Sequence, residues 1–148
     1  SEIAFAAQNS DTYLQEQYAS EASLHARLLL AVALCAEAAR QAREKEGGPL
    51  AAEAFAQRHG IPYRLVREVL DGLIRNRVLA EVAERPGEYL LYRCASTITV
   101  AEIAKILLNE GEPPEALGLD GLGDSVAAFD KKWGSMIDTA FAVSVAEV

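Results

Sequence analysis

The stretch Gly60–Val82, GIPYRLVREVLDGLIRNRVLAEV, decides the fold. Pro62 suits the first position of a helix, because a proline lacks the N–H that would have no partner there. The apolar residues that follow recur at spacings of three and four, which is typical of a helix with one buried face. They are Leu65, Val66, Val69, Leu70, Leu73 and Ile74. The stretch therefore predicts an amphipathic helix that runs into β-forming residues.

The residues before this stretch predict a second, shorter helix. In PLAAEAFAQRHG, residues 49–60, the side chains of Leu50, Ala54 and Phe55 are spaced for one face of a helix. Gly60 is well placed just after its end, where a left-handed residue is commonly needed. A short helix, a tight glycine turn and an amphipathic second helix together predict a helix-turn-helix.

A hairpin is predicted directly after the helix-turn-helix. Val78–Ala83 and Glu88–Arg93 are rich in β-forming residues. Between them, the tetrapeptide RPGE at residues 85–88 fits a type II turn, with proline at the second position and glycine at the third. The hairpin corresponds to the wing of a winged helix.

Helices are also predicted on both sides of this unit. A long helix begins after Ser20 or Ser23, since serine is a favourable N-cap. Its apolar stripe consists of Leu24, Leu28, Val32, Cys35 and Ala39. After the hairpin, Thr99 caps another helix, and Glu102 stands three residues on, as in a capping box.

The last predicted helix runs from Asp124 to about Ala146 and has one apolar face. The large residues of this face must be buried somewhere; they are Phe129, Trp133, Ile137 and Phe141. They either fold back on the winged helix or meet a second copy of the chain. A linker of 14 residues permits both arrangements, so the sequence leaves a homodimer through this helix open.

The predicted fold is mainly α with a small β-hairpin: a winged helix-turn-helix with an added long N-terminal helix and a C-terminal helix. Four parts are predicted along the chain. They are an apolar stump and polar lead-in (1–20), the winged-helix domain (21–109), a linker (110–123) and a C-terminal amphipathic helix (124–148). The linker is set apart by its two prolines and four glycines.

Charge argues against a nucleic-acid-binding protein. The chain has 14 basic and 22 acidic residues, a net charge of −8. Residues 1–49 carry four basic and seven acidic side chains, residues 50–97 seven and six, and residues 98–148 three and nine. Nucleic-acid-binding modules usually show a denser basic face, because groove binding needs several phosphate contacts. A solvated helix face is therefore the favoured interpretation of the arginines.

Four arginines nevertheless form the candidate site for nucleic acid or a protein partner. Arg64 and Arg67 lie near the start of the predicted second helix, where recognition helices present side chains to base edges. Arg75 follows on the same helix, and Arg85 lies on the wing.

No catalytic, metal or cofactor site is predicted. His25 and His59 have no acidic or nucleophilic neighbour at a suggestive spacing, and known hydrolase and phosphate-loop patterns are absent from the sequence. Cys35 and Cys94 are isolated, which is typical of buried thiols. The longest wholly apolar run, Leu28–Ala36, is too short to cross a bilayer, which needs about 20 residues. We therefore expect this chain by itself to be soluble.

Three stretches resemble the YihY/BrkB family of inner-membrane proteins, long labelled ribonuclease BN. Ser1–Tyr13, SEIAFAAQNSDTY, resembles the exit of the family's last membrane helix, and Leu24–Gln41 resembles its first cytosolic helix. Gly60–Val82 is similar to the family's winged-helix pattern, IPxRLVxxVLxxLxxxGLLxEV. The resemblance covers residues 1 to about 108. It implies a C-terminal cytosolic domain whose polytopic membrane part precedes Ser1.

One residue departs from the YihY/BrkB pattern, and the cysteine count departs from that of a second family. Arg77 stands where the YihY/BrkB family often has glycine. Soluble winged-helix repressors that carry an iron–sulfur cluster have a similar order of wing and helix, but they present three cysteines after the recognition helix. This chain has only Cys94 there, too few thiolates to hold a cluster.

Two function hypotheses follow. The first, implied by the resemblance, is a non-catalytic interaction or regulatory domain at the cytoplasmic face of a bacterial inner membrane, which docks a protein partner or self-associates. The alternative is a DNA-binding winged-helix transcriptional regulator with Arg64 and Arg67 in the major groove and Arg85 on the wing. A nuclease ranks last, because nothing in the sequence resembles a metal-dependent nuclease site.

Overall fold

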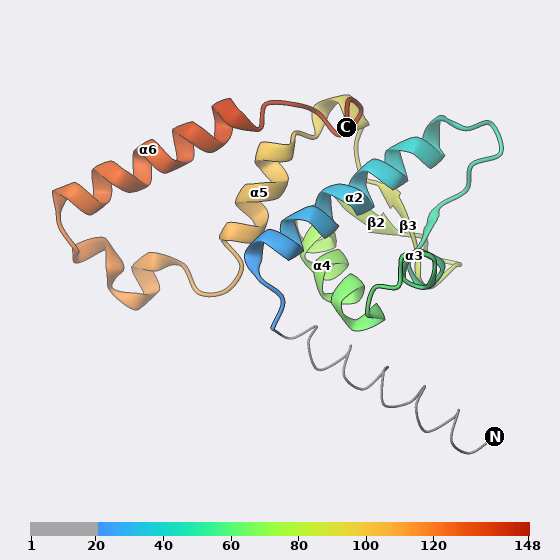
Figure 1. Ribbon diagram of the computed structural model, residues 1–148, viewed down its shortest axis with the longest axis horizontal. Helices are drawn as coiled ribbons and strands as arrows, with labels where there is room; N and C mark the ends of the chain where they lie inside the picture. The colour runs from blue at the N-terminus through green and yellow to red at the C-terminus, as the bar shows by residue number, and fades with distance from the viewer. Residues whose placement is uncertain (1–20) are drawn as a thin grey trace, which may run out of the picture.

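The structure, a computed structural model, describes residues 21–148, so the predicted stump at 1–20 lies outside the described residues. The elements are α2 (Leu24–Arg43), β1 (Leu50–Ala51), α3 (Ala52–His59), α4 (Tyr63–Arg75), β2 (Leu79–Glu81), β3 (Glu88–Leu91), η1 (Ala95–Thr97), α5 (Val100–Leu108), η2 (Pro114–Leu117), η3 (Leu119–Gly121) and α6 (Asp124–Ala140). In Figure 1 the elements from α2 to α5 gather in one body, and η2, η3 and α6 extend from it. We call residues 110–140 the arm.

The helix predicted within Gly60–Val82 is α4, and its apolar stripe lies at the centre of the core. Its buried residues are Leu65, Val66, Val69, Leu70, Gly72 and Leu73. They pack against α2, α3 and α5. Burying one valine or leucine side chain contributes about 1.5–3 kcal/mol, so the stripe is a major source of stability. The predicted fold, mainly helical with a winged helix-turn-helix, is confirmed.

A glycine turn joins α3 to α4. Gly60 has a φ of 64°, in the left-handed region that favours glycine. The N–H of Ile61 donates to the Ala56 carbonyl at 2.9 Å, which closes the end of α3. Pro62 occupies the N-cap position of α4, one residue before the first helical position that the sequence predicted for it. Its carbonyl accepts a hydrogen bond from the N–H of Val66 at 3.2 Å. The turn therefore fixes the direction in which α4 leaves α3.

The wing belongs to a sheet with one more strand than the sequence predicted. The described residues form a three-stranded antiparallel sheet in the order β1-β3-β2. The predicted turn is present, since Gly87 has a φ of 84° and the N–H of Glu88 donates to the Arg85 carbonyl at 3.1 Å. The unpredicted strand β1 pairs Leu50 with Tyr89, and both side chains are buried. A strand of two residues is too short to produce an alternating pattern.

The two predicted N-caps are confirmed. The hydroxyl of Ser23 accepts a hydrogen bond from the N–H of Ala26 at 3.1 Å and caps α2. The hydroxyl of Thr99 accepts one from the N–H of Glu102 at 3.1 Å and caps α5. Both helices then bury one face in the core, so each local signal agrees with the packing that follows it.

The C-terminal residues return to the body without helix, through a single bridge between Thr99 and Ser144, whereas the sequence predicted a helix to about Ala146. In the structure α6 ends at Ala140. The N–H of Val145 donates to the Ile98 carbonyl at 2.9 Å, and the N–H of Val100 donates to the Val143 carbonyl at 2.9 Å. Val145 is buried in the main core. Alternating β-branched residues suit this pairing, and a continued helix would remove Val145 from the core.

The arm is held to the body mainly at one end. Within α6, Ile137 is the one buried residue, and it packs against Ala101 and Ala104 of α5. An ion pair between Lys105 and Asp138 adds a polar contact at the same end. All residues from 109 to 133 are exposed. The apolar face predicted for this helix is therefore largely open to water.

One backbone position predicts a stabilising substitution. Arg77 has a φ of 58°, and the N–H of Val78 donates to the Leu73 carbonyl at 2.9 Å, so Arg77 is the left-handed residue that ends α4. Replacing it by glycine removes the steric cost of a Cβ there. We expect Arg77→Gly to raise the free energy of unfolding by about 0.5–1 kcal/mol, measured by urea denaturation. Arg77→Ala, which keeps a Cβ, should give no such gain, and equal effects would contradict this explanation.

Candidate nucleic-acid interface

The first turn of α4 presents polar side chains on the side away from the core. Tyr63, Arg64 and Arg67 are exposed, whereas Leu65 and Val66 between them are buried. This separation follows from the helical period, because the stripe that packs inward fixes the residues that point outward. The positive end of the helix dipole lies at the same turn. The surface therefore favours an anionic partner such as a phosphate.

Glu68 holds two arginines around this turn. One carboxylate oxygen lies 3.2 Å from Nε of Arg64, on the same helix, and the other lies 3.0 Å from Nη2 of Arg27 on α2. The Arg64 side chain is nevertheless 59% exposed. It can turn from Glu68 to a ligand at little cost, because an exposed ion pair of this kind contributes at most about 1 kcal/mol.

Arg67 lies between α4 and the wing. Its guanidinium stands 5.9 Å from the ring centroid of Tyr63, and a hydrogen bond with Tyr63 raises the pKa of Arg67. Both residues line an open hollow of about 350 Å³. The rest of the lining is Ala51, Glu53, Pro86, Gly87 and Glu88. The start of α4 and the tip of the wing thus face one space.

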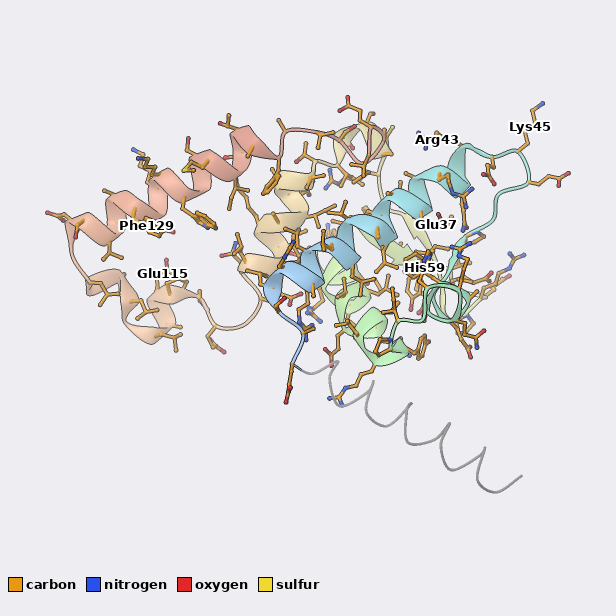
Figure 2. All side chains as sticks on the ribbon, viewed as in Figure 1. Glu37, Arg43, Lys45, His59, Glu115 and Phe129 are labelled. Atoms are coloured by element: carbon orange, nitrogen blue, oxygen red, sulfur yellow. The ribbon has the colours of Figure 1, made fainter. Side chains whose placement is uncertain are left out.

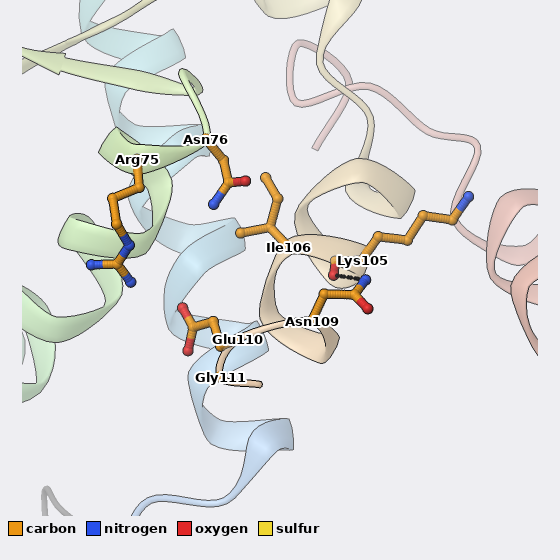
Figure 3. Close-up of a pocket in the computed structure, with 7 residues that line it drawn as sticks. All are labelled: Arg75, Asn76, Lys105, Ile106, Asn109, Glu110 and Gly111. Carbon is orange, nitrogen blue, oxygen red and sulfur yellow. Dashed lines mark hydrogen bonds between the residues drawn. The ribbon is translucent and has the colours of Figure 1, made fainter. Parts of the chain in front are cut away.

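The structure separates the four arginines predicted from the sequence. Arg64 and Arg67 share the first turns of α4, and Arg85 lies on the wing turn, 3.8 Å from Glu88. Arg75 is eleven residues beyond Arg64, about 16 Å along the helix axis. It lines a different hollow of about 370 Å³ with residues of α5 (Figure 3). Arg75 therefore does not belong to the same surface.

A charged network fixes α3 relative to α2, and sequence reasoning missed it. Glu37 on α2 accepts hydrogen bonds from Arg40 at 2.7 Å, Gln41 at 3.0 Å and Arg58 of α3 at 3.0 Å. The hydrogen bond from Arg40 is the main cause that lowers the pKa of Glu37 to about 2. Arg58 lies in the last turn of α3, next to His59. A basic residue at this end of the helix was the sequence feature that could have indicated a contact with an acidic side chain.

Part of the acidic charge of the chain lies in the arm, away from the start of α4 (Figure 2). Of the nine carboxylates after residue 97, six fall between residues 110 and 130, in the arm. Figure 2 shows Glu115 and Phe129 of the arm at the opposite end of the molecule from Glu37 and His59. The net charge of −8 is therefore a poor guide to the field at the start of α4, since screening limits the reach of surface charges to about 10 Å.

The two cysteines are free, one buried and one exposed. Burial raises the pKa of the Cys35 thiol to about 12, whereas Cys94 is exposed and a hydrogen bond with Ser96 lowers its pKa. His59 packs on Phe55, with ring centroids 4.6 Å apart. Among the described residues, no group of three or more His, Cys, Asp or Glu side chains is arranged to hold a metal ion.

Comparison with solved structures finds proteins with a similar fold. No family model and no curated protein matches the chain. The oxidized form of Staphylococcus aureus CymR matches with a TM-score of 0.60 and 16% identity, over 85% of this chain and 94% of that one. T. potens IscR matches with a TM-score of 0.58 and 16% identity, over 82% and 81%. CymR (YrzC), the global cysteine regulator of B. subtilis, matches with a TM-score of 0.50 and 14% identity, over 85% and 92%. The shared fold is that of winged-helix regulators.

The resemblance to the YihY/BrkB family is wrong. The structures that share the fold are winged-helix transcriptional regulators, which are not enzymes. The matching residues of Gly60–Val82 are mostly the buried stripe and the turn, and every winged helix needs residues of these types there. The more distinctive match, Ser1–Tyr13, lies outside the described residues.

The predicted place at the inner membrane is wrong for the same reason. The match covers 94% of the S. aureus CymR chain, so the described fold is that of nearly the whole of that structure. In residues 21–148, no helix is both long enough and apolar enough to cross a bilayer.

The Glu37 network predicts a pH dependence. The pKa of Glu37 is lowered on folding, so its contribution to stability is complete above the unfolded value near 4.5 and is lost as the pH falls toward about 2. We expect Glu37→Gln to destabilise the protein at pH 7 and the difference from the wild type to shrink between pH 4.5 and 2. Denaturant unfolding across this range measures it. Glu46→Gln, an exposed site on the loop after α2, is the control, and an equal effect there would contradict the assignment.

Proposed function

We propose that the chain is a DNA-binding winged-helix transcriptional regulator with α4 as its recognition helix. The observation that carries the proposal is the exposed group of Tyr63, Arg64 and Arg67 at the start of α4, of which Tyr63 and Arg67 face the wing across one hollow. The regulators with the same fold support it. At 14–16% identity these structures do not predict which DNA sequence is bound, so the experiment below selects it.

The side chains of α4 have distinct roles in this proposal. Arginine forms paired hydrogen bonds with the edge of guanine in the major groove, and Arg64 and Arg67 are placed on the end of α4 that would enter it. Arg85 on the wing would contact a phosphate and fix the register of the protein on the duplex. Glu68 keeps Arg64 oriented before binding.

We infer in addition that the protein acts as a homodimer through α6. Phe129 and Trp133 are 65% and 45% exposed, and their rings stack with centroids 6.3 Å apart. Phe141 is also exposed, while Ile137 alone of the four predicted residues is buried against α5. Covering this face with a second copy would remove the aromatic rings from water. Two copies also present two recognition helices, which read half-sites one DNA turn apart.

The DNA-binding proposal predicts unequal effects along one helix. Duplexes selected from a random pool by the purified chain supply the ligand, and fluorescence anisotropy measures affinity. We expect Arg64→Ala and Arg67→Ala each to weaken binding by roughly 1–3 kcal/mol and to relax the sequence preference at the base that each contacts. Arg75→Ala makes the same charge change on the same helix and should have little effect.

Two results would contradict this proposal. The first is failure to enrich any sequence and to bind duplex DNA at low salt. The second is a loss on Arg75→Ala as large as that on Arg67→Ala, which would show that only total charge matters.

The dimer is tested separately from DNA. Sedimentation equilibrium should give a mass near twice that of the chain, and Trp133→Ala should shift the population to monomer. Because Trp133 is half exposed in one copy, the variant should keep its helical circular dichroism spectrum. Tyr92→Ala, an exposed aromatic residue after β3, is the matched control and should stay dimeric. A monomeric wild type would contradict the proposed homodimer.

A further inference from the structure

The first half of the arm combines strong negative charge with exposed apolar side chains. Between residues 110 and 130 the chain has six carboxylates and neither lysine nor arginine. They are Glu110, Glu112, Glu115, Asp120, Asp124 and Asp130. Five large apolar side chains in the same range are exposed, among them Leu117 and Leu122. Such a segment has no core of its own, so its apolar groups gain from a partner that covers them.

Part of this segment, from Pro114 to Asp130, lines one groove. A hollow of about 400 Å³ lies between the η2–η3 turns and the first half of α6. Its apolar lining includes Leu119, Leu122 and Val126, with Phe129 at the border toward Trp133. Its acidic lining is Glu115, Asp120 and Asp130. Figure 2 shows Glu115 and Phe129 on the two elements that face each other there.

Charge decides what can occupy the groove. The same groove of a second copy would bring three more carboxylates against the first three, and like charges at a contact are repelled. DNA carries the same sign of charge and is excluded from this surface as well. A purely apolar ligand would leave the acidic rim without a partner. An occupant that satisfies both parts of the lining is apolar on one face and positively charged beside it.

We propose that this groove docks a basic amphipathic helix of another protein. Leucine-type side chains of the partner cover Leu119, Leu122 and Val126, and its lysines or arginines lie against Glu115, Asp120 and Asp130, which is the helix-in-groove mode of recognition. The groove lies on the arm, away from the start of α4 (Figure 1). Partner binding and DNA binding therefore use separate surfaces.

The test uses the full chain and a designed peptide. The probe is a fluorescein-labelled helix of about 18 residues, or five turns, with leucine at helical spacing and lysine elsewhere. Anisotropy should show saturable binding that weakens with added salt. We expect Leu119→Ser with Leu122→Ser to weaken it roughly tenfold, and Glu115→Gln with Asp120→Asn and Asp130→Asn to do the same.

Two controls separate the groove from general attraction to an acidic protein. Glu46→Gln with Glu53→Gln and Glu84→Gln changes the net charge equally at exposed sites elsewhere and should leave binding within about twofold of the wild type. A peptide of the same composition with its leucines out of helical register should bind more weakly.

Each contrary result overturns the proposal in a distinct way. Equal binding of the out-of-register peptide, or of a leucine–glutamate peptide, would remove the basic amphipathic helix as the occupant. Equal losses in the two charge variants would show nonspecific attraction. A drop in oligomer mass on Leu119→Ser with Leu122→Ser would make the groove a contact between copies. DNA affinity of that variant should stay unchanged, so failure here is distinguishable from failure of the DNA-binding proposal.

Discussion

Burial of the apolar stripe of α4 is the constraint on which the other features depend. Leu70 and Leu73 are fully buried among α2, α3 and α5, so α4 cannot rotate about its axis without exposing them. With the stripe fixed inward, the helical period places Arg64 and Arg67 outward. The candidate interface is therefore a consequence of core packing. The ion pair between Arg27 and Glu68 then ties the exposed face of α4 to α2 as well.

Predictions from the sequence succeeded where the determining contacts are local. The caps at Ser23 and Thr99 and the turn at residues 85–88 each depend on neighbours within four residues. Predictions failed where the contact is distant. Strand β1 exists because it pairs with β3, and the C-terminal chain leaves the helix where the N–H of Val145 donates to the Ile98 carbonyl. No periodicity within either segment could reveal a partner almost 40 or more residues away.

The candidate site was predicted in part. The exposure of Arg64 and Arg67 follows from the stripe, but the distance of Arg75 from them depends on where α4 ends and on its contact with α5. The charge argument against DNA rested on counts by sequence segment. Such counts do not show how the charges lie in space: six of the 22 carboxylates lie between residues 110 and 130, in the arm, and in salt solution a surface responds to charges within about 10 Å. Family resemblance failed because its matches lay mostly at buried positions of the fold.

Charge also divides the arm into two halves with different partners. The first half has carboxylates and no basic residue, so it is not complementary to itself. The second half has Lys131 and Lys132 beside Trp133, with Asp130 and Asp138 on either side, and this mixed pattern permits two copies to pair. Ile137 anchors only the second half to α5. A dimer formed there would hold both arms by their bases and leave the acidic grooves at their free ends open to another protein.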